Sequence, residues 1–318
     1  MEARDLTGRR RQAISGECFS PGHLPGDRQP GFQNARSPCL GVLTPINRKG
    51  TNDQPGPKLI LDCILRLGCY PPEKQIFRVK MKRQKIGFVH LPKTRGVSAI
   101  RAFSDVLGTD RCSTFRLAIS EDYFEENDFV SGHVFIGDVT AQCYLFTLLR
   151  APLEQIVSHL RWLDHYNLPE REGDLLRLPS EISVHVRRLQ RVDFSQHQEI
   201  ARFLSDIRES PLLKVRNVQA EMLAFSRASC RPVSDAELAD SAIANLSRFS
   251  YVGLSETIDS DLARIFSDLG LGRPRVAHLN ASPAIRTIDV TVPEIREALA
   301  AHVQADLILY NHVNQLRS

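Results

Sequence analysis

The residues that could do chemistry fall into three short segments, each beside an apolar run of strand length. The first segment follows the run 85–91 and consists of Pro92, Lys93, Thr94, Arg95, Gly96, Val97 and Ser98. A loop between a strand and a helix directs free backbone N–H groups and the positive end of the helix dipole to one place, which suits a phosphate. Lys93 adds a charge and Ser98 a hydroxyl. The alternative is an ordinary turn with a surface lysine, and a Walker A loop is excluded because GxxxxGK[ST] needs another glycine and a different lysine position.

The second segment begins where the apolar run 143–149 ends. Arg150 stands there, and an arginine in this place forms bidentate bonds to phosphate or sulfate well. Pro152 fits the first turn of a helix, and Ser158 falls in the second turn, where it could share an oxyanion with Arg150. The alternative is a local ion pair between Arg150 and Glu154.

The third segment is SGHVFIG, residues 131–137, which lies between the other two. His133 near the end of a strand could serve as a general base. A hydrogen-bonded structural histidine is the alternative.

In this order and spacing, the three segments resemble the sulfotransferases that use 3′-phosphoadenosine 5′-phosphosulfate (PAPS). The closest likeness is to the carbohydrate-directed branch, which includes the heparan sulfate 2-O-sulfotransferases and many bacterial relatives. FVHLPKTRGVS is similar to a strand followed by the family's PKTGGTS loop, LLRAPLEQIVSHLRW to its LRDPVERxxSxY, and SGHVFIG to its xGH. Weaker similarities are YVGLSETIDSDLARIFSDLGL, HLNASP and ADLILYNHV, so the resemblance covers residues 85 to about 315.

The resemblance implies a metal-free sulfuryl transfer from PAPS, as co-substrate, to a hydroxyl of a saccharide or glycoconjugate. It assigns Lys93 to the bridge between the 5′-phosphate and the sulfuryl group, and the backbone of residues 94–98 to the phosphate. It assigns Arg150 and Ser158 to the 3′-phosphate, and His133 to the proton of the acceptor. Such a transfer needs in-line placement and neutralisation of charge on the leaving oxygens, which side chains can supply.

Three positions depart from the family pattern. Arg95 stands where glycine or alanine is usual, which costs about 1 kcal/mol if the position needs a positive φ. Val97 replaces a threonine, and Ala151 replaces an aspartate. The departures at Arg95 and Val97 leave open a non-catalytic nucleotide- or glycan-binding relative. A P-loop-like nucleotide kinase or NTPase is a second alternative, although the missing Walker lysine counts against it.

Alternating strand and helix patterns predict an α/β fold, a P-loop NTPase-like three-layer α/β/α architecture with a central parallel sheet. Strands are expected at 85–91, 129–136, 143–149, 250–254 and 275–279. Helices are expected at 97–107, 153–165, 180–190, 194–208, 212–226, 234–246, 256–269, 292–300 and 301–314. A helical insertion at about 170–248 would shape the acceptor side, where Arg187, Arg188 and Arg191 could face an anionic glycan or simply solvent. Trp162 and Tyr166 could stack on a sugar, although core packing explains Trp162 better.

The first 80 residues differ in composition from the rest. They hold 9 of the 18 Pro and 9 of the 18 Gly, with a net charge of +6, which leaves −2 for residues 81–318. We therefore expect a disordered or over-extended N-terminal segment, with a natural start at Met81, before a catalytic domain at 81–318. The acidic balance of that domain argues against a nucleic-acid partner.

The cysteines and the apolar segments give further expectations. The seven cysteines form no zinc-type set, so reduced thiols and no structural metal are expected. The apolar stretch 59–70 is too short to span a bilayer, and no secretory signal is evident. A cytoplasmic protein without a transmembrane segment is the simplest expectation, and peripheral membrane association is compatible with it.

Overall fold

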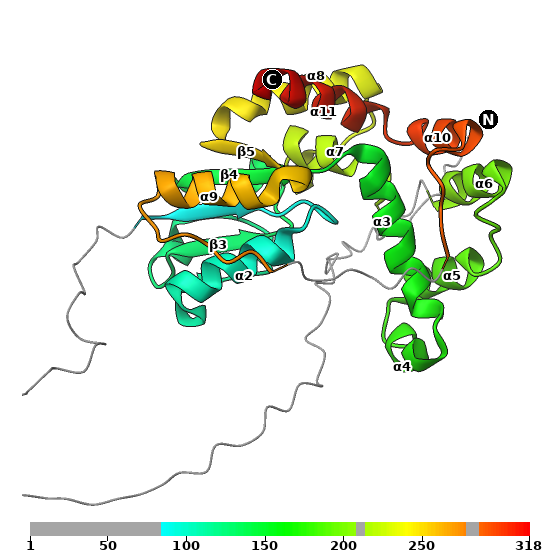
Figure 1. Cartoon of the computed structure of the whole chain (residues 1–318), viewed down its shortest axis with the longest axis horizontal. Coiled ribbons are helices and arrows are strands. Elements are labelled where there is room, and N and C mark those ends of the chain that lie inside the picture. The colour runs from blue at the N-terminus through cyan, green and yellow to red at the C-terminus, as the bar shows by residue number, and fades with distance from the viewer. Residues whose placement is uncertain (1–83, 208–213, 278–285) are drawn as a thin grey trace, which may run out of the picture. The chain divides into compact units, whose positions relative to one another are not determined.

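A computed structural model describes residues 84–207, 214–277 and 286–318. The expectations for the N-terminal segment 1–80 and for the HLNASP motif lie outside these residues. Within the described part, five parallel strands form one sheet in the order β2-β3-β1-β4-β5 (Figure 1), which confirms the predicted α/β class with a central parallel sheet. The strands are β1 (Ile86–Val89), β2 (Cys112–Ser113), β3 (Phe129–Gly132), β4 (Tyr144–Leu149) and β5 (Tyr251–Leu254).

One face of the sheet is covered by α2 (Gly96–Leu107) and α9 (Ile258–Asp268). Their contact with the sheet is largely aromatic: the rings of Phe88 and Phe146 stack at 4.6 Å, and Phe103 of α2 stacks on Phe129 at the same distance. Buried rings of this size remove a large apolar area from water, so this layer fixes α2 on the sheet.

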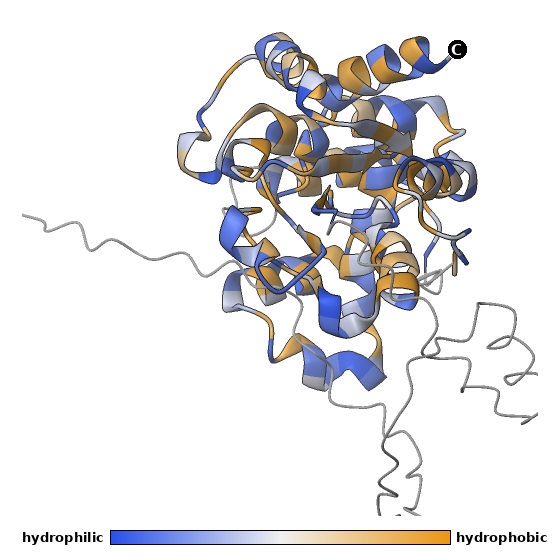
Figure 2. Cartoon of the chain, turned by 90° about the vertical axis from the view of Figure 1, so that its left-hand side faces the viewer, coloured by the Kyte–Doolittle hydropathy of each residue, from blue (hydrophilic) through white to orange (hydrophobic). Residues whose placement is uncertain are grey.

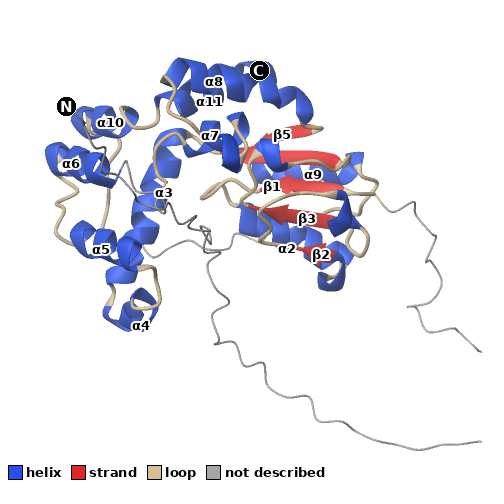
Figure 3. Ribbon diagram, turned by 180° about the vertical axis from the view of Figure 1, so that it is seen from behind, coloured by secondary structure: helices blue, strands red, loops and turns tan. Residues whose placement is uncertain are grey.

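The opposite face is covered by three other helices, α7 (Val218–Ala224), α8 (Asp235–Ala244) and α11 (Gln304–Arg317). Two helical layers therefore enclose the sheet (Figure 3). This arrangement is compatible with a three-layer α/β/α fold, and it explains why the strands are apolar on both faces.

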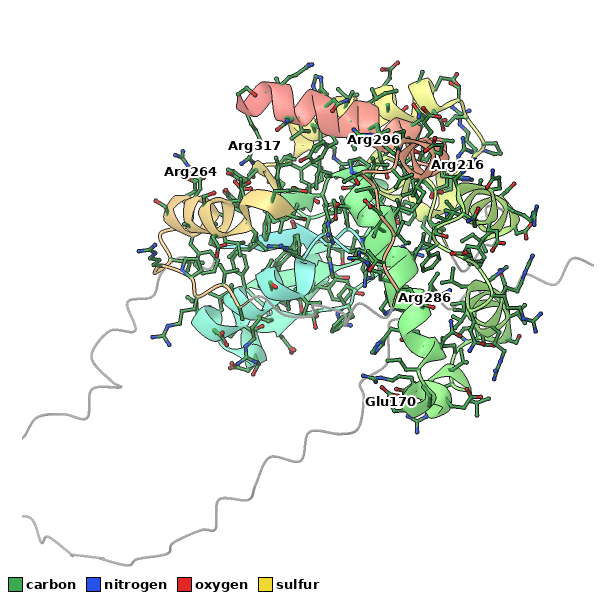
Figure 4. All side chains as sticks on the ribbon, turned by 45° about the vertical axis from the view of Figure 1, so that its right-hand side comes forward. Glu170, Arg216, Arg264, Arg286, Arg296 and Arg317 are labelled. Atoms are coloured by element: carbon green, nitrogen blue, oxygen red, sulfur yellow. The ribbon has the colours of Figure 1, made fainter. Side chains whose placement is uncertain are left out.

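The remaining helices form a cluster with its own core beyond one end of the sheet. Hydrophobic and hydrophilic residues alternate along most helices (Figure 2), as packing against a core on one side requires. Arg286 ties the cluster together, since its guanidinium pairs with Asp164 and donates to the carbonyl of Val192 at 2.6 Å (Figure 4). The members are α3 (Pro152–Asp164), α4 (Glu172–Leu175), α5 (Ser180–Leu189), α6 (His197–Ile207) and α10 (Pro293–Ala300).

The helical segment expected at 170–248 is helical, but it divides between two places. Helices α4, α5 and α6 belong to the separate cluster, whereas α7 and α8 cover the sheet. The three arginines of interest lie at the end of α5 and just after it, and two are paired: Arg187 with Glu172 and Arg188 with Asp206. A solvated, ion-paired surface accounts for these two.

Besides small shifts at other boundaries, three elements differ from the sequence prediction. Residues 275–277 form no strand, and residues 278–279 lie outside the described residues. Strand β2 was not predicted because two residues carry no period. Helix α7 begins only at Val218, because Asn217 before it has a left-handed φ of 47°.

The strand order creates a switch point between β1 and β4. From β1 the chain runs through α2 toward β2 at one edge, whereas from β4 it runs toward β5 at the other. Ligands of open parallel sheets bind outside the carboxyl ends of the strands where connections diverge in this way. The loop after β1 and Arg150 after β4 lie at this point. Among the described helices, none is long and apolar enough to cross a membrane.

Candidate functional site

The loop after β1 has the backbone geometry of an anion-binding turn. Lys93 and Arg95 have φ of 65° and 62°, and Thr94 between them is not left-handed. Alternation of this kind turns successive N–H groups toward one point. Arg95 is the N-cap of α2 and provides no side-chain hydrogen bond to the helix. The N–H of Ser98 donates to the carbonyl of Arg95 at 3.0 Å, so the N–H groups of Gly96 and Val97 are the first-turn donors able to reach an external acceptor.

Neighbouring side chains hold this loop in place. The hydroxyl of Thr94, which is fully buried, donates to the carbonyl of Leu91 at 2.8 Å, and the amide of Gln155 donates to the carbonyl of Pro92 at 3.1 Å. Ser98 is buried and Val97 is exposed. The hydroxyl of Thr94 therefore stabilises the loop, and the backbone N–H groups of the loop are what could bind an anion.

Lys93 projects from this loop toward the last turn of α3. Its Nζ lies 5.4 Å from the ring centroid of Trp162. Burial, and secondly the nearby charge of Arg150, lowers the pKa of Lys93 from its usual 10.5 to about 8. Among the described residues Lys93 has no carboxylate partner, so it is able to exchange its contact with the aromatic ring for an anion.

Arg150 is bonded directly to the loop. Its Nη1 donates to the carbonyl of Lys93 at 3.1 Å, and its Nη2 lies 3.6 Å from Glu154. The ion pair with Glu154 that the sequence offered as the alternative is therefore present, and the bond to the Lys93 carbonyl was not predicted. Ser158 lies in the second turn of α3, half-buried, and makes no hydrogen bond to Arg150 or to the loop within the described residues.

His133 is brought to the same edge of the sheet, one residue after β3. Its Nδ1 lies 2.8 Å from the carbonyl oxygen of His90, and the two imidazole rings are 4.6 Å apart. A carbonyl oxygen only accepts, so Nδ1 carries the proton and Nε2 has the free lone pair. Burial, then the charges of Arg227 and Lys93, lower the pKa of His133, although the bond to His90 opposes them. His133 is therefore neutral at neutral pH and able to accept a proton.

Three buried polar atoms beside the loop have no partner among the described residues: Nδ1 of His90, Oε1 of Gln155 and Nδ1 of His159. Burial, then the charges of Lys93 and His133, lower the pKa of His159 to about 3. Burial lowers the pKa of His90 as well. Each unpaired buried group costs about 1–3 kcal/mol, so their gathering around one loop points to a polar ligand that satisfies them.

Sequence reasoning missed these three residues. His90 sits inside an apolar run and was taken as part of the strand. Gln155 and His159 are spaced by one helical turn on α3, and that i, i+4 spacing at the start of a helix after Arg150 is the signal that could have found them.

No known family model matches the chain, and no curated protein is similar to it in sequence. No group of three or more His, Cys, Asp or Glu side chains that could hold a metal ion occurs among the described residues. The site is thus defined by its own geometry: a loop with open N–H groups, Lys93 and Arg150 as cations, and a neutral imidazole beside them. Such a set can bind an oxyanion and can accept a proton from a hydroxyl.

Proposed function

We propose that the chain is a sulfotransferase that moves the sulfuryl group of PAPS to a hydroxyl, on a saccharide or glycoconjugate. The observation that carries this proposal is the placement of Lys93 beside both the Arg150 guanidinium and the tautomer-fixed imidazole of His133. The P-loop-like character of the fold belongs to the same proposal, and the position of the loop at the β1/β4 switch point supports it.

In the proposed reaction, residues 93–98 hold the 5′-phosphate and Arg150 holds the 3′-phosphate. Nε2 of His133 takes the proton of the acceptor hydroxyl while its oxygen forms the new S–O bond. The S–O bond to the 5′-phosphate breaks, and 3′-phosphoadenosine 5′-phosphate leaves with the electron pair. The Lys93 ammonium offsets the charge that develops on the leaving oxygen. Ser158 is retained only as a candidate contact to the 3′-phosphate.

The test measures binding of 3′-phosphoadenosine 5′-phosphate, adenosine 5′-phosphate and ATP to the full chain by calorimetry. Trp162 is the single tryptophan, and it lies under Lys93, so its fluorescence provides a second readout. We expect micromolar binding that depends on the 3′-phosphate and disappears in Arg150→Ala. Transfer of labelled sulfate to a panel of saccharide acceptors follows, with His133→Ala losing about 100-fold or more of the rate.

Two results would overturn the proposal. Equal binding of the three nucleotides, followed by magnesium-dependent ATP turnover, would make the chain a kinase or NTPase. Binding that requires the 3′-phosphate without transfer to any acceptor, and with equal affinity in His133→Ala, would indicate a non-catalytic relative.

A further inference from the structure

A buried glutamine of α7, a helix on the sheet face opposite α2, holds the backbone of Arg150. The side chain of Gln219, which is 1% exposed, accepts from the N–H of Arg150 at 2.9 Å and donates to its carbonyl at 2.9 Å. One amide thus satisfies both backbone groups of Arg150, and only this orientation of the amide does so. The backbone at the end of β4 is fixed by a residue that is 69 positions away in sequence.

Gln219 is itself fixed by Asp306 at the start of α11. Asp306 is 1% exposed, and its carboxylate accepts from the backbone N–H of Ala220 at 2.7 Å and of Gln219 at 3.4 Å. Asn217 precedes α7 and has a left-handed backbone. Its side chain accepts a hydrogen bond from the N–H of Ala305 in α11 at 3.0 Å. The first turns of α7 and α11 therefore cap each other, which holds Gln219 in one place.

The segment that follows Arg150 is fixed in a similar way. Glu256 accepts from the N–H of Ala151 at 2.8 Å, and the hydroxyl of Ser255 donates to the carbonyl of Leu149 at 3.0 Å. Because the carbonyl of Leu149 and both backbone groups of Ala151 are hydrogen-bonded, the guanidinium of Arg150 retains its side-chain torsions as its main freedom. An arginine whose backbone is fixed loses less conformational entropy when its guanidinium binds an oxyanion than an arginine with a mobile backbone.

We propose that Gln219 is a positioning residue of the anion site: it sets the place of the Arg150 guanidinium by holding the Arg150 backbone, and Asp306 supports it from α11. The ligand group concerned is the 3′-phosphate of a nucleoside 3′,5′-bisphosphate, so this inference rests on the proposed function. Gln219 does not touch the nucleotide in this scheme.

The test compares the full chain with Gln219→Leu, which removes both bonds to Arg150, and with Gln219→Glu, which keeps the acceptor and removes the donor. The measured quantity is the ratio of the affinities for 3′-phosphoadenosine 5′-phosphate and adenosine 5′-phosphate. We expect Gln219→Leu to lower this ratio about tenfold, with the affinity for adenosine 5′-phosphate changed less than about threefold. We expect Gln219→Glu and Asp306→Asn to lower the ratio as well. If the leucine variant fails to fold, the ratio measured for Gln219→Glu tests the proposal.

Asn245→Leu is the matched control, because the Asn245 amide donates to the carbonyl of Leu223 at 3.0 Å at the opposite end of the same helix α7. We expect it to lower the unfolding temperature while leaving the affinity ratio at the wild-type value. An unchanged ratio in folded Gln219 variants, or an equal fall in Asn245→Leu, overturns the positioning role while the proposed function stands. A wild-type chain without preference for the 3′-phosphate overturns both.

Discussion

The imidazole ring of His90 lies directly against the backbone of Gly96, so that a Cβ at position 96 would fall 1.9 Å from Cδ2 of the ring. The same histidine supplies the carbonyl that fixes the tautomer of His133. Gly96, the first residue of α2, and His133 therefore both contact His90, Gly96 at the His90 ring and His133 at the His90 carbonyl. Any atom added at Gly96 must displace the His90 ring.

The first prediction concerns this contact. Gly96→Ala should lower the free energy of unfolding by about 1–3 kcal/mol, because the added methyl group overlaps the ring. Gly96→Ala combined with His90→Ala should recover part of that loss, since the second substitution removes the atoms in conflict. Urea denaturation measures both effects as a double-mutant cycle.

Gly173→Ala is the control, since a Cβ at Gly173 would have no atom within 4 Å. That variant should be as stable as the wild type or slightly more so, because alanine favours the helix. Wild-type stability of Gly96→Ala, or the absence of any recovery in the double variant, would contradict the argument.

The second prediction concerns Arg95, whose φ of 62° confirms that the position needs a left-handed backbone. A non-glycine residue pays about 1 kcal/mol or more for this conformation. Arg95→Gly should therefore raise the free energy of unfolding by about 1 kcal/mol. Arg101→Gly, on an exposed position inside the same helix, should lower it by about 1 kcal/mol, because glycine weakens helix interiors. Urea denaturation measures both changes in the free energy of unfolding. Changes of the same sign in the two variants would count against left-handed strain at Arg95.

Much of the fold could be predicted because buried parallel strands and amphipathic helices leave strong periods. Four strands and nine helices were expected within a few residues of where they lie in the described part of the chain. Strand β2 was not predicted because its two residues are too few to show a hydrophobic period. The start of α7 was predicted too early, because hydrophobic spacing does not reveal a left-handed asparagine. The division of the helices between two cores depends on tertiary packing, which local patterns do not contain.

The juxtaposition of Lys93, His133 and Arg150 was also predictable, because each follows a parallel strand and the carboxyl ends of such strands share one edge. Ser158 and His159 show the limit of this reasoning. A motif pointed to Ser158, yet the next residue, about 100° further around α3, is the one that is buried and coupled to Lys93. Gln219 and Asp306 were not predictable, since each lies in a helix remote in sequence from Arg150. Gln219 contacts the Arg150 backbone, and the Asp306 carboxylate contacts the backbone of Gln219 and Ala220.

The third prediction is a pH dependence of nucleotide binding that originates in Lys93. Its pKa of about 8 means that the free protein loses this positive charge as the pH rises through that value. Affinity for 3′-phosphoadenosine 5′-phosphate should therefore fall above pH 8, by at most about tenfold per unit. Calorimetry at pH 8 in buffers of different ionisation enthalpy should also show proton uptake on binding, since an anion raises the pKa of a neighbouring lysine.

Lys93→Arg provides the comparison, because a guanidinium remains protonated throughout this range. Its affinity, whatever its absolute value, should be flat from pH 7 to about 9.5. A flat profile in the wild type, or a parallel decline in Lys93→Arg, would remove Lys93 as the origin of the dependence.

The fourth prediction concerns stability in acid. His159 has a pKa of about 3 in the folded protein, well below its usual 6.5, chiefly because of burial. When the pH falls below about 6.5, the unfolded chain binds a proton that the folded protein does not. The stability that neutral His159 contributes is complete above that value and is lost progressively as the pH falls toward 3, with a slope of at most about 1.4 kcal/mol per unit.

His159→Phe should remove this contribution to the slope and so resist acid better than the wild type between pH 6.5 and 4. Asp306, whose pKa burial raises to about 7, acts in the opposite direction over much of this range, but it is present in both proteins and cancels in the difference. Urea denaturation from pH 8 to pH 4 gives the two curves. Whatever offset the two curves show at pH 8, the wild type should lose stability relative to His159→Phe as the pH falls, because only the wild type must keep a buried imidazole neutral below pH 6.5. Parallel curves would mean that His159 is hydrated and titrates normally in the folded protein, in which case its unpaired Nδ1 would no longer indicate a ligand.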